Sequence, residues 1–198
     1  MLTLDTLGKA AAAPSFEQPL EMLQACHDKI RRFCDQLDKL PPYIEEHGVD
    51  DAARNTIDDV VRYFDVAGPA HHTDEEEELF PLLEERLPTA ASRLEQLSAE
   101  HGYLHSCWNA IRDDLVALRD GHIRQISRTE LQEFARQYRE HAAAEEEWLF
   151  PAAANALSAE ELRQAGANMA RRRQGGNPPL QAKRAARFRR QPVAIFTL

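Results

Sequence analysis

The chain has 198 residues, 43% of them hydrophobic, which fits one domain with tails better than two full domains. Residues 1–161 carry 15 Lys and Arg against 33 Asp and Glu, whereas residues 162–198 carry nine basic residues and no acid, for a net charge of -9. An acidic body repels nucleic acid and anionic lipid. We therefore expect no specific nucleic acid partner and no membrane contact.

The chain lacks an apolar run of about 18 residues and a basic start followed by an apolar stretch, so neither a membrane span nor an export signal is expected. The three cysteines have neither a disulfide-like nor a zinc-like spacing. This pattern favours a reducing compartment, and we expect the protein in the cytoplasm.

The first two predicted helices are separated by His47-Gly48. In the first helix His27 fills the one gap in a 3-4-3-4 series of apolar residues formed by Leu20, Leu23, Ile30, Cys34 and Leu37. The second helix begins at Asp50-Asp51 and is expected to bend or restart at Gly68-Pro69. Its apolar face comprises Ile57, Val60, Val61 and Phe64.

The third and fourth predicted helices have polar residues in core positions. In the third helix His101 belongs to an apolar series of Leu94, Leu97, Leu104, Trp108, Ile111, Leu115 and Leu118. The fourth helix opens with a capping box at Ser127 and Glu130, and His141 and Glu145 occupy successive core positions.

Four such helices without alternating β-branched runs predict an all-α fold, an antiparallel up-and-down four-helix bundle. We assign the bundle to residues 18–157. Residues 1–17 are expected to form an N-terminal arm, and residues 158–198 a basic, disordered C-terminal tail. The tail is compatible with non-specific contact to a polyanion or with folding back on the acidic body.

The chain also contains an internal repeat. HHTDEEEELFP from residue 71 and HAAAEEEWLFP from residue 141 share the pattern H-x-x-x-E-E-E-x-L-F-P, and EMLQACH from residue 21 matches EQLSAEH from residue 95. The sequence therefore indicates two copies of one helical hairpin, which would pair around a shared core. The repeated Leu-Phe-Pro is interpreted as core packing followed by a helix kink or stop.

Residues four apart share one helix face, so three i, i+4 pairs can converge on one centre. Together with His27 from the first helix, they supply five imidazoles and two carboxylates: His71 with Glu75, His101 with His105, and His141 with Glu145. Each residue taken alone has a simpler interpretation as a satisfied core histidine or a solvated acid. Burying all seven without a cation would cost several kcal/mol each, which a marginally stable domain cannot absorb.

This donor set selects among metals. It is too large for one tetrahedral zinc and too hard for copper(I), but it suits two octahedral first-row ions bridged by carboxylates. We expect two iron ions with an oxo or hydroxo bridge. One coordination position would then stay open for a small-molecule ligand such as dioxygen or nitric oxide.

These motifs resemble those of hemerythrin-like, or HHE cation-binding, proteins over roughly residues 18–157. The resemblance rests on His27, HHTDEEEELFP, EHGYLH and HAAAEEEWLFP in that order. It implies that His101, His105 and His141 hold one iron, that His27 and His71 hold the other, and that Glu75 and Glu145 bridge them.

The sequence departs from the oxygen-carrying members of that family at one bridging position. Those members have an aspartate five residues after the last histidine, whereas this chain has Glu145 and Glu146 in the fourth and fifth places. The repeat favours Glu145 as the bridge, with Glu146 as the alternative. His72 is likewise an alternative to His71, and we interpret it as a supporting or surface residue.

The sequence favours a binding protein that takes up or senses dioxygen, nitric oxide or iron over a dedicated enzyme. The alternative is a stress-response enzyme that repairs iron-sulfur clusters, reduces nitric oxide or removes peroxide. Repair proteins that the chain resembles carry a cysteine-bearing N-terminal domain, and residues 1–17 contain no cysteine. A structural metal site is the third possibility.

Overall fold

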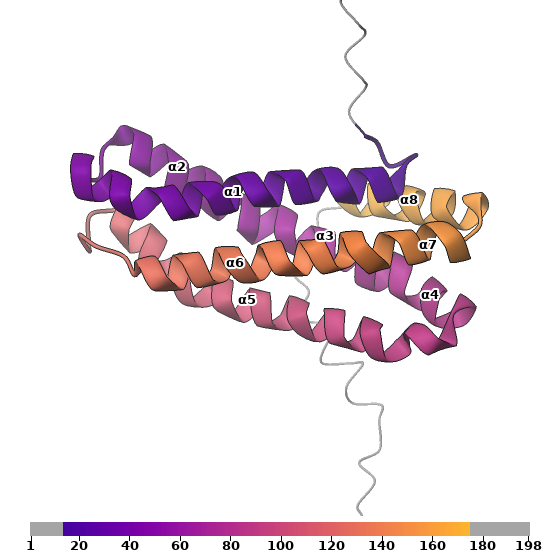
Figure 1. The fold of residues 1–198 in the computed structure, drawn as a ribbon. Coiled ribbons are helices and arrows are strands. Elements are labelled where there is room, and N and C mark those ends of the chain that lie inside the picture. Colours follow the sequence, from indigo (N-terminus) through magenta and orange to yellow (C-terminus); the bar gives the residue numbers. More distant parts are fainter. Residues whose placement is uncertain (1–13, 175–198) are drawn as a thin grey trace, which may run out of the picture.

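The computed structural model describes residues 14–174, and all regular secondary structure in that range is helical. The helices lie side by side as a bundle (Figure 1), with α1 packed along α6 and α5 packed against both α6 and α2. In chain order they are α1 (Pro19–His47), α2 (Asp51–Arg62), α3 (Gly68–Asp74), α4 (Phe80–Arg86), α5 (Ala91–Arg119), α6 (Arg128–Ala144), α7 (Phe150–Ala156) and α8 (Ala159–Gln174). No helix in this range has the length and apolar character that crossing a membrane requires.

Three π-helical turns join the shorter helices into longer rods: η1 (Tyr63–Ala67), η2 (Glu75–Leu79) and η4 (Glu145–Leu149). Each turn ends two residues before a proline, at Pro69, Pro81 and Pro151. Proline removes a backbone donor and clashes with the carbonyl one turn earlier, and a wider turn relieves the clash. The helix continues through these prolines, so the predicted stop is wrong, and a widened π turn precedes each proline at which a bend or kink was predicted. A single 3-10 turn, η3 (Pro88–Ala90), precedes α5.

Two predicted helix starts can be compared with the structure. The Oγ of Ser127 accepts a hydrogen bond from the backbone N–H of Glu130 at 3.3 Å, so the predicted cap of α6 is confirmed. Asp50 caps α2 in the same way, through the N–H of Ala53 at 2.9 Å. These caps satisfy backbone donors that a helix start otherwise leaves unpaired.

The core consists of two apolar clusters, one toward each end of the bundle. The first is built around residues such as Ile30, Leu37, Ile57, Leu115 and Phe134, and the second around Leu23, Leu79, Leu97, Leu149 and Met169. Along α1, His27 lies between Leu23 of one cluster and Ile30 of the other. The polar core residues found in the sequence therefore form a layer between two apolar regions.

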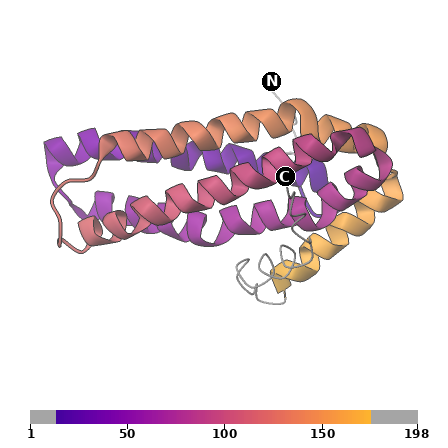
Figure 2. The same ribbon diagram turned by 90° about the horizontal axis from the view of Figure 1, so that it is seen from below.

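Helix α8 falls within the segment 158–198 that the sequence analysis assigned to a disordered tail. It contacts α1 and η2 (Figures 1 and 2), and its Ala165 and Met169 are buried. A Cβ on Gly166 would lie 1.8 Å from the backbone oxygen of Phe16, so glycine allows this close approach. Residues 159–174 are thus ordered on the bundle, and residues 175–198 lie outside the described range, as does most of the predicted arm.

Candidate metal centre

Seven buried polar side chains form the layer between the two apolar clusters. They come from α1, α3, η2, α5, α6 and η4, and are His27, His71, His72, Glu75, His101, His141 and Glu145. Within them, two groups bring potential ligand atoms within 4.8 Å of one another. One group is His27, His71, Glu75 and Glu145, and the other is His72, His101 and His141.

Glu145 lies between the two groups, and each of its oxygens faces a different pair of histidines. Oε1 is 3.0 Å from Nε2 of His141 and 3.2 Å from Nε2 of His101. Oε2 is 3.1 Å from Nε2 of His27 and 4.0 Å from Nε2 of His71. The side chain is fully buried. A carboxylate in this position can give one oxygen to each of two cations.

Glu75 repeats this arrangement from the other hairpin. Its Oε1 is 3.5 Å from Nε2 of His71, and its Oε2 is 3.6 Å from Nε2 of His101. Both oxygens are buried, and neither has a hydrogen-bond partner within residues 14–174. Glu75 thus also spans the two histidine pairs.

Burial and neighbouring charges shift the pKa values of Glu75 and Glu145 in opposite directions. Burial, then the charge of Glu145, raises the pKa of Glu75 well above its ordinary value. Burial also acts to raise the pKa of Glu145, but His141, His101 and His27 outweigh it and hold that pKa well below its usual range. Two anions this close repel each other, which favours a state with one proton on the pair when no cation is present.

The histidines differ in the same way. Burial, with the neighbouring His27, lowers the pKa of His71 well below its ordinary value. Burial acts in that direction on His141 too, but Glu145 and Glu100 raise its pKa to about 9. A histidine binds a metal ion as a neutral imidazole, so a bound cation would displace the second proton of His141.

Outer carboxylates hold three of the histidines by their other ring nitrogen. Nδ1–H of His27 donates to Glu146 at 2.9 Å, that of His101 to Glu76 at 2.8 Å, and that of His141 to Glu100 at 2.9 Å. This pairing leaves Nε2 of each histidine to face the centre of the layer. Such carboxylate–histidine pairs fix the tautomer of metal-binding histidines and raise their basicity.

The neighbouring carboxylates Glu145 and Glu146 thus differ in position. Glu146 lies behind His27, its side chain is 23% exposed, and its second oxygen accepts a hydrogen bond from Arg31 at 2.7 Å. Burial opposes the effect of Arg31 and His27, but the net result is a lowered pKa for Glu146. Of the two glutamates, the structure brings only Glu145 between the histidine pairs.

The structure brings six of the seven predicted site residues together and leaves His105 outside both groups. His105 is only half-buried, whereas His72 is buried beside His101 and His141. The reason lies in α5, where Leu104 and Trp108 take the inward positions after His101. The expectation that His105 faces the centre is therefore corrected. Of the two interpretations of His72, burial excludes a surface residue and leaves a supporting one.

His72 is held by contacts that the sequence did not indicate. Its ring stacks on that of His101, with centroids 4.0 Å apart and planes 7° apart, and its Nε2 is 3.0 Å from the hydroxyl of Tyr138. A Cβ on Gly68 would lie 3.0 Å from that hydroxyl, so glycine leaves room for it. The His72 ring lies parallel to that of His101, whereas two imidazoles that bind one ion converge on it from different directions. The packing of His72 therefore indicates that it supports the His101 ring.

Five buried polar atoms of the layer lack a hydrogen-bond partner among the described residues. They are Nδ1 of His71, both carboxylate oxygens of Glu75, Nε2 of His141 and Oε2 of Glu145, of which the last two lie within ion-pair distance of Glu145 and His27, respectively. An unsatisfied buried polar group costs roughly 1–3 kcal/mol, and more if it is charged. Four of the five face the space between the histidine pairs, where cations would convert them into ligands. The residues present therefore fit a pair of metal ions.

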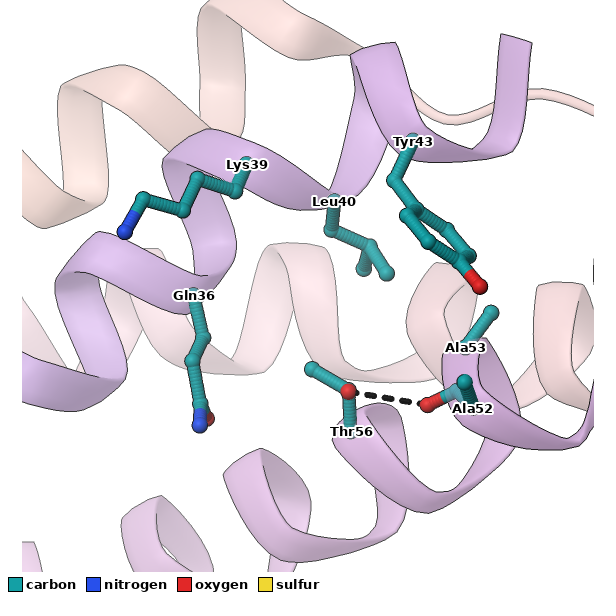
Figure 3. A pocket seen from close by; sticks show the side chains of 7 residues that line it. All are labelled: Gln36, Lys39, Leu40, Tyr43, Ala52, Ala53 and Thr56. Carbon is teal, nitrogen blue, oxygen red and sulfur yellow. Dashed lines mark hydrogen bonds between the residues drawn. The ribbon is translucent and has the colours of Figure 1, made fainter. Parts of the chain in front are cut away.

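A separate hollow lies far from this centre. A groove of about 210 Å³ between α1 and α2 is lined by residues including Gln36, Leu40 and Thr56 (Figure 3). Leu40 follows His27 by 13 residues of the same helix, which corresponds to about 20 Å. The groove therefore does not give access to the histidine–glutamate layer.

The fold and this layer together define a helical-bundle protein with a cation-binding site made of histidine and glutamate. The chain belongs to the hemerythrin HHE cation binding domain family, whose pattern matches residues 18–153. It is also 39% identical, over 160 residues, to a protein of Haemophilus influenzae named only "Uncharacterized protein". That alignment covers 81% of this chain and 92% of the relative.

Proposed function

We propose that the chain binds two iron ions in a dinuclear non-haem centre. His101 and His141 would hold one ion, His27 and His71 the other, and Glu75 and Glu145 would bridge them. The observation that carries the proposal is the position of Glu145, whose two oxygens face different histidine pairs within 3.0–4.0 Å. If the centre held a single ion, one carboxylate oxygen of Glu75 and one of Glu145 would have no metal ion to bind.

Iron is the proposed metal because the donors are imidazole nitrogens and carboxylate oxygens without sulfur. Carboxylate-bridged pairs of octahedral first-row ions use such ligands, whereas structural zinc prefers a closed tetrahedral set. Four histidines and two glutamates leave coordination positions that the protein does not fill. Such positions are where a small ligand can reach a metal.

We propose that the centre binds or senses dioxygen or nitric oxide. An iron pair supplies ligand binding and redox chemistry when it is bound, and the chain supplies the surroundings. Its two apolar clusters exclude bulk water, and Glu146, Glu76 and Glu100 hold three of the four proposed histidine ligands in place. We keep the cytoplasm as the proposed location because of the cysteine pattern.

We also infer that the helices form an antiparallel up-and-down four-helix bundle built from two repeated hairpins. Short connections support this arrangement, since only three residues separate α1 from α2. Short loops favour antiparallel neighbours in bundles. The π turns at Glu75–Leu79 and Glu145–Leu149 recur at equivalent places in the two halves.

The test is metal analysis of the full chain produced with iron supplied. We expect about two irons per chain in the wild type and a loss of metal in Glu145→Ala and His101→Ala. The matched controls are the neighbours Glu146→Ala and His105→Ala, which should still load two ions when iron is in excess. A wild type with one iron, or mainly zinc, would refute the dinuclear iron centre.

A second measurement addresses the ligand. The absorption bands of the ferric protein should change reversibly when azide, a small anionic probe, is added and removed. Many turnovers of nitric oxide or peroxide per site would instead assign an enzyme. If removing the metal lowers the helical content and the bound metal does not respond to small ligands, the site has a structural role.

A further inference from the structure

The two halves of the centre are related by the sequence repeat, and most of their supporting contacts are equivalent. Phe80 stacks on His101 with ring centroids 5.9 Å apart, and its equivalent Phe150 stacks on His27 at 5.2 Å. Glu76 accepts from Nδ1 of His101, and its equivalent Glu146 accepts from Nδ1 of His27. For this pair of histidines, the duplicated hairpins thus provide the same support.

The equivalence fails at the other pair of histidines. Glu100 accepts a hydrogen bond from Nδ1 of His141 at 2.9 Å. The position that the repeat aligns with Glu100 is Cys26, and Nδ1 of the equivalent His71 is buried without a hydrogen-bond partner among the described residues. The Cys26 thiol instead lies 3.9 Å from the sulfur of Met22. His71 therefore lacks the carboxylate that orients His141.

We propose that the two ion positions differ in affinity, a proposal that rests on the dinuclear centre proposed above. The position of His101 and His141 retains its ion, whereas the position of His27 and His71 binds its ion more weakly and exchanges it. Both histidines of the first position have a carboxylate on Nδ1, and only one histidine of the second does. Removing such a partner typically weakens metal binding about 10- to 100-fold.

Other differences between the halves point the same way. His72 stacks on His101 and is bonded to Tyr138, whereas the repeat aligns these two residues with Ala142 and Gly68. A buried polar pair therefore supports the His101–His141 side alone. The His27–His71 side has small or apolar residues at the equivalent places, so its ligands are less constrained.

The asymmetry suggests a substitution that would restore the missing partner. Cys26→Glu places a carboxylate at the position that Glu100 occupies in the other half. Burial raises the pKa of the Cys26 thiol, Lys29 and Arg173 act in the opposite direction, and Asp74 acts with burial, so two cations and one carboxylate lie near this position. The two cations would stabilise an introduced carboxylate, and Asp74 would oppose it.

The experiment is a titration of the metal-free full chain with Co(II), a redox-stable ion that accepts the same ligands, in competition with a chelator. The wild type should bind two ions in two steps. His141→Ala should abolish the tighter step and His71→Ala the weaker one. Two neighbouring cations repel each other, so two binding steps would be seen even in a symmetric centre. Variants of the residues next to the histidine ligands are therefore needed to show that the two positions differ.

Those variants test the support directly. Glu100→Ala should weaken the tighter step about 10- to 100-fold, and Cys26→Glu should strengthen the weaker step by a similar factor. Glu147→Ala, which removes an exposed carboxylate of the same acidic run, is the matched control and should change neither step.

Two outcomes would overturn the proposal: a Glu100→Ala protein whose tighter step is unchanged, or one in which only the weaker step weakens. If Cys26→Glu does not fold, Glu100→Ala and the two histidine variants still decide the question. Binding of fewer than two ions by the wild type would refute the dinuclear centre itself, which is a different result.

Discussion

The docking of α8 on the bundle depends on a buried carboxylate, Asp74, that immediately precedes Glu75. Its side chain is 0% exposed, and its two oxygens are divided between two arginines of α8. Arg172 lies 3.1 Å from Oδ1 and Arg173 lies 2.6 Å from Oδ2. Burial raises the pKa of Asp74, and Arg173 and Arg172 counteract that rise. We predict that removing these arginines destabilises the metal-free protein strongly.

The magnitude follows from the partners that each substitution leaves. Arg173→Met removes the cation that lies 2.6 Å from Oδ2, and losing a hydrogen bond to a charged group costs about 1.5–3 kcal/mol. The double substitution of Arg172 and Arg173 by Met leaves a buried carboxylate uncompensated, which typically costs about 3–5 kcal/mol. Arg171→Met, at an exposed arginine of the same helix that is bonded to Asn168, should change stability by less than about 0.5 kcal/mol.

The assay is urea unfolding of the full chain in the presence of a chelator, so that metal binding does not contribute to the free energy. Adding Asp74→Ala to the double variant should recover much of the loss, because the uncompensated charge is then gone. If Arg173→Met is no more destabilising than Arg171→Met, the ion pairs do not hold α8 and the reasoning fails.

Two further predictions concern the layer itself. A free metal concentration of a hundred times the dissociation constant should raise the free energy of unfolding by about 2.7 kcal/mol per ion. Urea unfolding measures this change, and an unchanged midpoint would show that metal does not bind the folded layer preferentially. Tyr138→Phe should destabilise the metal-free protein by about 0.5–1.5 kcal/mol through the lost bond to His72. Tyr103→Phe, at a side chain that is 50% exposed, is its control, and equal effects of the two would contradict the role of that bond.

The sequence predicted the helical character of the chain and most residues of the layer because helix periodicity places a polar residue in an apolar series. His27, His101 and His141 each occupy such a position, and all three are buried. The repeat then selected Glu145 over Glu146, which agrees with its place between the histidine pairs. Periodicity and the repeat can both be recognised in the sequence itself, so neither requires knowledge of the tertiary structure.

His105 and His72 show where these signals are insufficient. Spacing of four residues puts His105 near the face of His101, but Leu104 already holds the inward position on that turn. His72 is buried in α3, a helix in which six of seven residues are buried and whose Asp74 pairs with Arg172 of α8. Neither the wide turns nor the docking of a basic helix has a periodicity that the sequence alone displays.

The π turns connect the Leu-Phe-Pro repeat with the glutamates of the centre. In η2 and η4 the first residue is Glu75 or Glu145, and its carbonyl accepts a hydrogen bond from the N–H of Phe80 or Phe150, five residues on. The following proline cannot donate to the preceding turn, which makes the wider turn favourable there. In both hairpins the widened turn precedes the proline of the repeat and begins at the residue that lies between the two histidine pairs. A motif that sequence alone suggests is a helix kink or stop thus also marks the position of the bridging carboxylates that we propose.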